Sequence, residues 1–457
     1  MSGYKDKIPY YCKRALALLN DAGFEAYVVG GAVRDLVMGK QPHDFDVTTS
    51  ATPDEVITVM EKASVRCIPT GIRHGTVTVL TGNDNVSEQV EITTFRVDGS
   101  YSDMRHPDSV GFTRSIEEDV RRRDFTINSM YLDREGNITD ITGGTEDIRT
   151  GLIRTVGDGN RRFTEDALRI MRGLRLAAQT GFDIEQDTMK AMADNAALLG
   201  NIAGERIAAE LDRLVTAPYA SKIISSSVPV LKVIIPELEE CQGFDQKSRF
   251  HDRDVLEHTL AVLDGIPADD SGSRDTSLAL AALLHDIAKP RCFYLDSRGI
   301  GHMKGHPAVS AGIADRLLVS LHYSKAVHDE VVRLIAYHDY YIPPAVSSVH
   351  RYLCNCGPGF FRKLVILQRA DIMAHSAAGR DRLERLDEII RTADELDARG
   401  AIYRVPDLRI SGKDIIDLGV APGAGVGKIL DRLFDEYVEG RLQNDREALI
   451  RRATELS

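Results

Sequence analysis

A glycine pair between an apolar run and a helix-forming segment constrains the fold of this chain more than any other feature. Ala26–Val29 is short and β-favouring, and Gly30 and Gly31 follow it directly. Glycine adopts backbone angles closed to other residues and leaves room for a ligand, and backbone N–H groups that open a helix suit a phosphate. Arg34 falls one turn into that helix, where its guanidinium can reach the same anion. We predict a strand, a glycine turn and a helix that together hold a phosphate group.

A pair of carboxylates follows shortly after. Asp44 and Asp46 alternate with Phe45 and Val47 in a segment that we predict to be a strand. Alternation places the two carboxylates on one face and the two apolar side chains on the other. Carboxylates crowded on one face repel unless a cation lies between them, and Mg²⁺ binds such oxygens together with water and substrate phosphates. The pattern predicts metal-assisted phosphoryl or nucleotidyl transfer.

A third carboxylate lies on another predicted strand, Val90–Arg96. Alternation turns Glu91 to the face opposite Ile92, where it can join the two aspartates. An exposed glutamate on an edge strand fits the spacing equally well.

The ordered combination of GGxxRD and, about ten residues later, DxD resembles the signature of the polymerase-β-like nucleotidyltransferases. Within them it is similar to the class II tRNA CCA-adding enzymes and their bacterial poly(A) polymerase relatives. These enzymes carry an acidic residue on the strand of Glu91, so the resemblance implies a catalytic role for Glu91 beside Asp44 and Asp46. It also implies a triphosphate site formed by Gly30, Gly31 and Arg34.

Two further segments extend the resemblance. The polar stretch Asp98–Val110 is typical of a mobile loop and resembles the flexible loop of full CCA-adding enzymes, in which we single out Arg105. We predict that Asp124 and Asn128, four residues apart, share one face of a helix. They belong to an RRDxxxN motif, which by resemblance contacts the sugar and phosphates through Arg123, Asp124 and Asn128.

A charged helix is predicted to open at Glu165, with Thr164 as its N-cap. Its charged residues fit a helix with surface salt bridges, and they also fit base recognition, because Asp accepts from an exocyclic amine and Arg donates to ring acceptors. Cytosine and adenine both present an amine beside a ring acceptor. The segment resembles the EDxxRxxR motif of class II enzymes, in which Asp166 and Arg169 match the base-reading positions and Arg172 completes the motif.

The second half of the chain is rich in histidine, with ten of the thirteen. His285–Asp286 follows a strongly apolar stretch, and together with His258 and Asp371 it resembles the H…HD…D constellation of HD-domain metal phosphohydrolases. Mixed imidazole and carboxylate ligands suit a transition-metal ion. A second metal or a phosphate has candidate ligands in His306 and His338. The resemblance implies phosphatase or 2′,3′-cyclic phosphodiesterase activity, and the alternative is an HD scaffold that only packs helices.

These motifs predict an α+β protein, with a small mixed β-sheet head followed by helices. We expect the head at 1–150, a helical neck for base recognition and RNA binding at 151–235, an HD domain at 236–376 and a helical tRNA-binding tail at 377–457. The net charge of −12 argues against wholesale wrapping of nucleic acid but allows a local basic groove. The six scattered cysteines and the lack of an apolar run of membrane length favour a cytoplasmic protein without a membrane partner.

The resemblance implies template-independent addition of C, C and A to tRNA from CTP and ATP, with Mg²⁺ at the head and no obligate protein partner. Three alternatives remain: a poly(A) polymerase or a CC- or A-adding enzyme on the same scaffold, a phosphohydrolase whose head recruits RNA, and a non-catalytic RNA-binding module.

Overall fold

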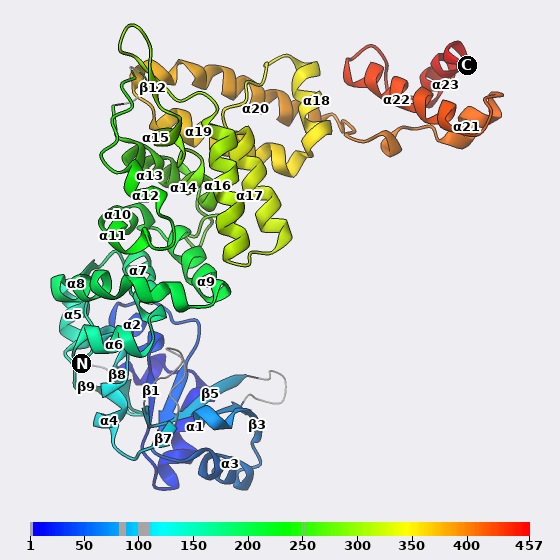
Figure 1. The fold of residues 1–457 in the computed structure, drawn as a ribbon. Helices are drawn as coiled ribbons and strands as arrows, with labels where there is room; N and C mark the ends of the chain where they lie inside the picture. The colour runs from blue at the N-terminus through cyan, green and yellow to red at the C-terminus, as the bar shows by residue number, and fades with distance from the viewer. Residues whose placement is uncertain (1–2, 82–87, 99–109, 249, 251) are drawn as a thin grey trace. The chain divides into compact units, whose positions relative to one another are not determined.

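A computed structural model describes residues 3–81, 88–98, 110–248, 250 and 252–457 of the chain. Two compact units make up the structure, residues 1–236 and 237–457. The first combines a β-sheet with helices and the second is mainly helical, which confirms the predicted α+β class (Figure 1). Among the described residues, no helix has the length and apolar character needed to cross a membrane.

A seven-stranded mixed sheet organises the first unit. Its strands, in order across the sheet, are β3 (Arg66–Gly71), β4 (Thr76–Leu80), β5 (Gln89–Thr94), β2 (Asp46–Thr49), β1 (Ala26–Val29), β8 (Met130–Leu132) and β9 (Ile138–Asp140). β2 runs parallel to β5 and antiparallel to β1. Val28, Val47 and Ile92 of these three central strands are buried in the hydrophobic core of the head. Because these side chains face the core, the residues that alternate with them on β2 and β5 face away from the core and are available to bind polar ligands.

Helices pack around this sheet and continue beyond it. Those of the head are α1 (Tyr10–Asp21), α2 (Gly31–Val37), α3 (Pro53–Lys62), α4 (Ile116–Arg121) and α5 (Gly144–Thr150). Those that follow are α6 (Gly159–Glu165), α7 (Leu168–Thr180), α8 (Gln186–Asn195), α9 (Gly204–Val215), α10 (Ala220–Ser226) and α11 (Val228–Leu231). Short strand pairs accompany them: β6 (Arg96–Asp98) with β7 (Val110–Phe112), and β10 (Leu152–Ile153) with β11 (Asp183–Ile184).

The predicted strand, glycine turn and helix are confirmed as β1, Gly30 and α2. Gly30 has φ of 76°, a conformation that other residues rarely adopt. The start of the next predicted strand differs from the prediction. Strand β2 begins at Asp46, so Asp44 lies before it. Even so, Phe45 and Val47 are buried while Asp44 and Asp46 are exposed, so the alternation of faces holds.

The single helix predicted from Glu165 is wrong. Helix α6 ends at Glu165, and α7 begins only at Leu168. The Asp166 backbone is extended, with φ of −146° and ψ of 103°, which separates the two helices, and its carboxylate accepts the Leu168 N–H at 3.1 Å. Thr164 is not an N-cap, because its hydroxyl donates back to carbonyls within α6.

The helix predicted across Asp124 and Asn128 is also wrong. Helix α4 stops at Arg121, and the next element is a short 3₁₀ turn, Thr126–Asn128. The backbone between them is tied to another segment, because the Val156 N–H donates to the Asp124 carbonyl at 3.0 Å. Extended pairing therefore replaces the local helical preference.

The second unit contains two groups of helices. The HD-like group consists of α12 (Glu237–Cys241), α13 (Val255–Gly265), α14 (Thr276–Leu284), α15 (Lys289–Cys292), α16 (His306–Ser320), α17 (Lys325–Tyr337), α18 (Val346–Cys356), α19 (Pro358–Ala374) and α20 (Leu383–Ala398). A hairpin of β12 (Tyr294–Leu295) and β13 (Gly301–His302) lies between α15 and α16. The last helices, α21 (Gly412–Asp417), α22 (Ala424–Val438) and α23 (Arg446–Leu456), share a small hydrophobic core of their own.

Candidate functional site

Two of the three candidate carboxylates of the head, Asp46 and Glu91, lie on neighbouring strands, and Asp44 lies just before the first of them. Val47 of β2 pairs in parallel register with Ile92 of β5, which makes Asp46 and Glu91 neighbours on the face opposite the core. Surrounding protein atoms remove part of the hydration of the Asp46 carboxylate and thereby raise its pKa. The negative charges of Glu91 and Asp44 raise it further. Mutual repulsion of this kind is relieved by a cation, so the donor set fits a divalent metal ion.

Arg34 connects the glycine turn with the RRDxxxN motif. Its guanidinium donates to the Asn128 side-chain oxygen at 3.0 Å and pairs with Asp35 at 2.8 Å. A Cβ placed on Gly31 would lie 3.5 Å from Arg34 Nη2, so the guanidinium folds back over the turn. The structure thus brings together three of the residues that the sequence predicted for nucleotide binding.

Arg123 is held in a buried network that the sequence did not reveal. Its guanidinium contacts the Asp119 carboxylate at 2.9 Å and donates to the Tyr131 hydroxyl at 2.8 Å. Arg122 pairs with the other Asp119 oxygen at 2.8 Å. Arg123 also lowers the pKa of Asp46 by its positive charge, which places it near the carboxylate cluster. Asp119 is therefore a positioning residue for Arg123.

We expect Asp119→Asn to lower the free energy of unfolding by about 3–5 kcal/mol, because it removes the buried carboxylate that two half-buried guanidiniums share. Burial alone would raise the pKa of Asp119, but Arg123 and Arg122 lower it to about 2. The stabilisation is therefore present above about pH 4 and is lost as the pH falls toward 2. Urea unfolding at several pH values measures both effects. An equal loss in Asp187→Asn, an exposed control, would contradict the assignment.

Asp124 and Arg172 form a second, half-buried pair. Arg172 Nη2 lies 2.6 Å from the Asp124 carboxylate, which also accepts the Phe125 N–H. Burial alone would raise the pKa of Asp124, but Arg172 and Arg169 lower it to about 2. The RRDxxxN and EDxxRxxR motifs are thus in direct contact, although 48 residues separate these two positions.

The two base-reading candidates have other partners in this structure. Asp166 lies 3.4 Å from Arg206 of α9. Arg169 pairs with Glu165 at 2.8 Å and donates to the Arg122 carbonyl at 3.1 Å. Both side chains are thereby held at the junction of the head and the following helices. The spacing of residues in the sequence did not predict the contact between Asp166 and Arg206.

A cavity of about 380 Å³ lies beside this junction. Its lining includes Arg121, Arg122, Arg161, Arg162 and Glu165. Four guanidiniums around one cavity suit phosphate groups of a nucleotide or RNA. Arg105, the remaining nucleotide-binding candidate, lies outside the described residues.

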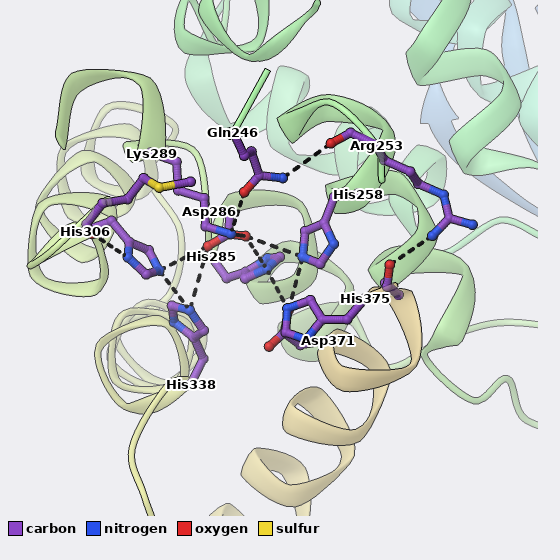
Figure 2. A network of polar contacts seen from close by, with 12 residues as sticks. Gln246, Arg253, His258, His285, Asp286, Lys289, His306, His338, Asp371 and His375 are labelled. Carbon is purple, nitrogen blue, oxygen red and sulfur yellow. Dashed lines mark hydrogen bonds and ion pairs between the residues drawn. The ribbon is translucent and has the colours of Figure 1, made fainter. Parts of the chain in front are cut away.

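The four predicted HD residues form one buried cluster (Figure 2). His258 Nε2 lies 3.0 Å from Asp371 and 3.4 Å from Asp286. His285 Nε2 lies 3.1 Å from Asp286 and 3.7 Å from Asp371. The cluster draws its members from α13, the end of α14 and α19, so that three helices converge on it.

A second group shares Asp286 with the first. The other oxygen of Asp286 lies 3.1 Å from His306 Nε2 and 3.7 Å from His338 Nε2. The two imidazole Nε2 atoms are 3.3 Å apart. Within the described residues, these two are the clusters of His, Asp, Glu or Cys side chains that lie close enough together to hold a metal ion. The carboxylates of the head lie further apart than that.

The imidazoles are oriented as metal ligands usually are. Nδ1 of His285, His306 and His338 each faces a backbone carbonyl at 2.7–2.9 Å, which leaves Nε2 turned inward. His285 Nε2 and Asp286 Oδ1 are buried and make no hydrogen bond of normal geometry among the described residues. Buried atoms of this kind fit a divalent ion between them.

The imidazoles of the cluster differ in charge when no metal ion is bound. Burial and the His285 charge lower the pKa of His338 to about 3, which keeps that imidazole neutral. Burial would lower the pKa of His285, but Asp286 raises it to about 10. Asp286 and Asp371 are ionised, with pKa values well below the ordinary range despite burial, because imidazoles and Lys289 surround them.

The cluster opens into a pocket of about 780 Å³. Lys289, one turn past Asp286, contacts its carboxylate at 2.6 Å and Gln246 at 3.1 Å. His375 also lines the pocket and stacks parallel to His258, with ring centroids 5.3 Å apart. Sequence reasoning missed Gln246 and His375, although the spacing of four residues between Asp371 and His375 was a usable signal; His375 directly follows the last residue of α19.

Three family models match successive parts of the chain. The poly(A) polymerase head domain matches residues 26–154, the probable RNA- and SrmB-binding site of polymerase A matches 181–241, and the HD domain matches 255–399. Together they cover the head sheet, helices α8 to α12 and the metal cluster.

Full-length relatives and solved structures agree with these matches. The CCA-adding enzyme of Leuconostoc mesenteroides is 33% identical over 96% of this chain and 94% of that protein, and that of Streptococcus pyogenes is 34% identical over 96% and 95%. The structure of the Bacillus stearothermophilus CCA-adding enzyme in complex with CTP has a TM-score of 0.71 and 26% identity, and the similarity covers 98% of both chains. The head geometry, the family models and these full-length similarities together show that the chain belongs to the CCA-adding enzymes, a family of nucleotidyltransferases.

Proposed function

We propose that the chain adds C, C and A to the 3′ end of tRNA, using CTP and ATP and releasing pyrophosphate. The observation that carries the proposal is the carboxylate cluster at β2 and β5, in which Asp46 pairs with Val29 directly before the glycine turn and feels the positive charge of Arg123. Relatives support it, because similar structures include complexes with CTP and, for the fold, a Thermotoga maritima CCA-adding enzyme complexed with tRNA.

Asp44, Asp46 and Glu91 are the proposed catalytic residues, and the two aspartates would hold two Mg²⁺ ions. Bound there, the ions would make the tRNA 3′-hydroxyl a better nucleophile and neutralise the departing pyrophosphate. The raised pKa of Asp46 supports this assignment, since loss of hydration and then the negative charges of Glu91 and Asp44 disfavour its ionised form without a cation.

The triphosphate site would adjoin these carboxylates. Arg34 over the Gly31 turn supplies a guanidinium for the phosphates, and Asn128 supplies an amide beside it. The full set proposed for sugar and phosphate contacts is Gly30, Gly31, Arg34, Arg105, Arg123, Asp124 and Asn128.

Asp166, Arg169 and Arg172 would recognise the base. Glu165 and the Arg122 carbonyl hold Arg169, and Asp124 holds Arg172, so the guanidiniums are oriented before a nucleotide binds. Asp166 can accept from the exocyclic amine and Arg169 can donate to the ring acceptor of either cytosine or adenine.

We expect Arg169→Ala to lower the preference for CTP and ATP over UTP and GTP by about 10- to 100-fold, because it removes one partner of the base edge. Total nucleotide transfer should fall less than the preference. Competition assays with pairs of nucleoside triphosphates measure the ratio. Arg149→Ala changes an exposed arginine and serves as the control. An unchanged preference in Arg169→Ala would rule out base reading by this residue.

As part of the same proposal, the head spans 1–150, the neck 151–235, the HD domain 236–376 and the tRNA-binding tail 377–457, and the enzyme works in the cytoplasm. The six cysteines are free thiols, which supports a reducing compartment. The direct test is incorporation of labelled CTP and ATP into a tRNA transcript that lacks its CCA end. Incorporation should require Mg²⁺, and chelation should abolish it. Long A tails would instead indicate a poly(A) polymerase.

The buried cluster in the second unit supports a second function, metal-dependent phosphohydrolysis. We propose that His258, His285, Asp286 and Asp371 hold a transition-metal ion, and that His306 and His338 complete a second site with Asp286. On a 2′,3′-cyclic phosphate, water would add to phosphorus and one ring P–O bond would break. The released ribose oxygen takes a proton, so the product is a phosphate monoester.

A further inference from the structure

The hairpin β12–β13 presents two aromatic rings at the mouth of the metal pocket. Tyr294 and His302 both line the pocket, together with the metal-ligand candidates Asp286, His306 and Asp371. The two rings stack nearly parallel, with centroids 5.3 Å apart and an interplanar angle of 25°. Tyr294 is 50% exposed, so a ring face remains open to a ligand.

The hairpin is held rigidly. Asp296 accepts the N–H groups of Arg298 and Ile300 in the turn, and its second oxygen lies 3.1 Å from His302 Nε2. The turn therefore fixes the ring on which Tyr294 stacks. A ring pair fixed in this way loses little conformational freedom when a flat ligand binds.

Contacts also fix the hairpin relative to the metal cluster. The Gly301 N–H donates to the Lys247 carbonyl at 2.9 Å, and a Cβ on Gly301 would lie 2.2 Å from the Gln246 carbonyl oxygen. Gln246 in turn accepts from Lys289, which contacts Asp286. On the other side, β13 ends at His302 and α16 begins at His306. The rings and the metal ligands therefore belong to one continuous framework.

We infer that Tyr294 and His302 form a base-stacking platform, and that the HD pocket takes nucleotides whose phosphate lies at the metal cluster. This inference rests on the proposed phosphohydrolase function. The walls supply the three parts of a nucleotide site: metal ligands and Lys289 for the phosphate, Lys304 for further negative charge, and stacked rings for the base. A phosphate ester without a base would contact the metal ligands and the lysines but would gain no binding energy from the stacked rings.

The test compares adenosine 2′,3′-cyclic phosphate with glycerol 1,2-cyclic phosphate, which lacks a base, using metal-loaded full-length protein. Tyr294→Ala should raise KM for the adenosine substrate about tenfold, because base–aromatic stacking contributes that much to binding. Hydrolysis of the glycerol substrate, followed by ³¹P NMR, should not change. Tyr294→Phe should behave as the wild type, because it keeps the ring.

Leu295→Ala is a matched control on the same strand, because Leu295 is 55% exposed and alternates to the other side of the hairpin. An equal loss on both substrates in Tyr294→Ala, or no loss on either, would overturn the platform. If the wild type hydrolyses neither substrate, the proposed phosphohydrolase function fails. In that case calorimetry tests the platform separately, by measuring the binding of adenosine 2′-phosphate and of glycerol 2-phosphate. Tyr294→Ala should bind the adenosine ligand about tenfold more weakly than the wild type does. Equal binding of the adenosine ligand by the variant and the wild type would contradict the platform.

Discussion

We expect an Asp44→Ala variant to lose nucleotide incorporation by at least about 10³-fold while it folds normally, because the proposed metal ions contribute several kcal/mol to the stabilisation of the transition state. Asp44 is exposed and precedes β2, so its removal leaves no buried group unsatisfied. Single-turnover extension of tRNA with saturating CTP measures the rate, and the thermal midpoint measures folding.

Asp54→Ala is the matched control, since Asp54 is an exposed aspartate in the first turn of α3. It should retain wild-type rates. Wild-type turnover in Asp44→Ala would rule out the carboxylate cluster as the catalytic centre, whatever the result for the control.

The second large effect is expected from Asp286→Asn, which changes the residue shared by both metal-ligand groups. We expect the protein to lose bound transition metal and its hydrolysis of 2′,3′-cyclic phosphates to fall at least about 100-fold, because metal catalysis contributes several kcal/mol. Elemental analysis after dialysis and the ³¹P assay measure the two losses. Nucleotide incorporation by the head should remain.

Because Asp286 is buried, His306→Ala provides a second variant nearer the pocket surface, and it should also lose hydrolysis. His328→Ala is the control, since His328 pairs with Asp315 and Asp329 away from the cluster. Full hydrolysis by both metal-site variants would leave the HD domain as a scaffold that packs helices.

Local sequence patterns predicted those parts of the site where the residues allow few alternative structures. The apolar run before Gly30 and Gly31 allows little besides a strand and a turn, and the φ of Gly30 confirms why glycine is needed there. The HD constellation was predicted as a group from its resemblance to the H…HD…D pattern of HD-domain phosphohydrolases, and the structure brings the four residues together.

The predictions failed where long-range contacts override local preference. The charges from Glu165 onward fit one helix, yet the extended backbone of Asp166 interrupts it, and the Asp166 side chain pairs with Arg206, 40 residues away. Asp124 lies in an extended segment because residue 156 pairs with its backbone. Asp119 looked like one acidic residue among several, and only the fold shows that it holds two arginines.

Stepwise extension of three tRNA transcripts tests the central claim most directly. The transcripts end at the discriminator base, at C and at CC, and each is incubated with Mg²⁺ and CTP, ATP or both. We predict that all three grow to a CCA end and no further, with CTP needed for the first two and ATP alone sufficient for the third. Extension that stops at CC, unlimited addition of A, or no extension of any transcript would contradict the assignment of CCA addition to this chain.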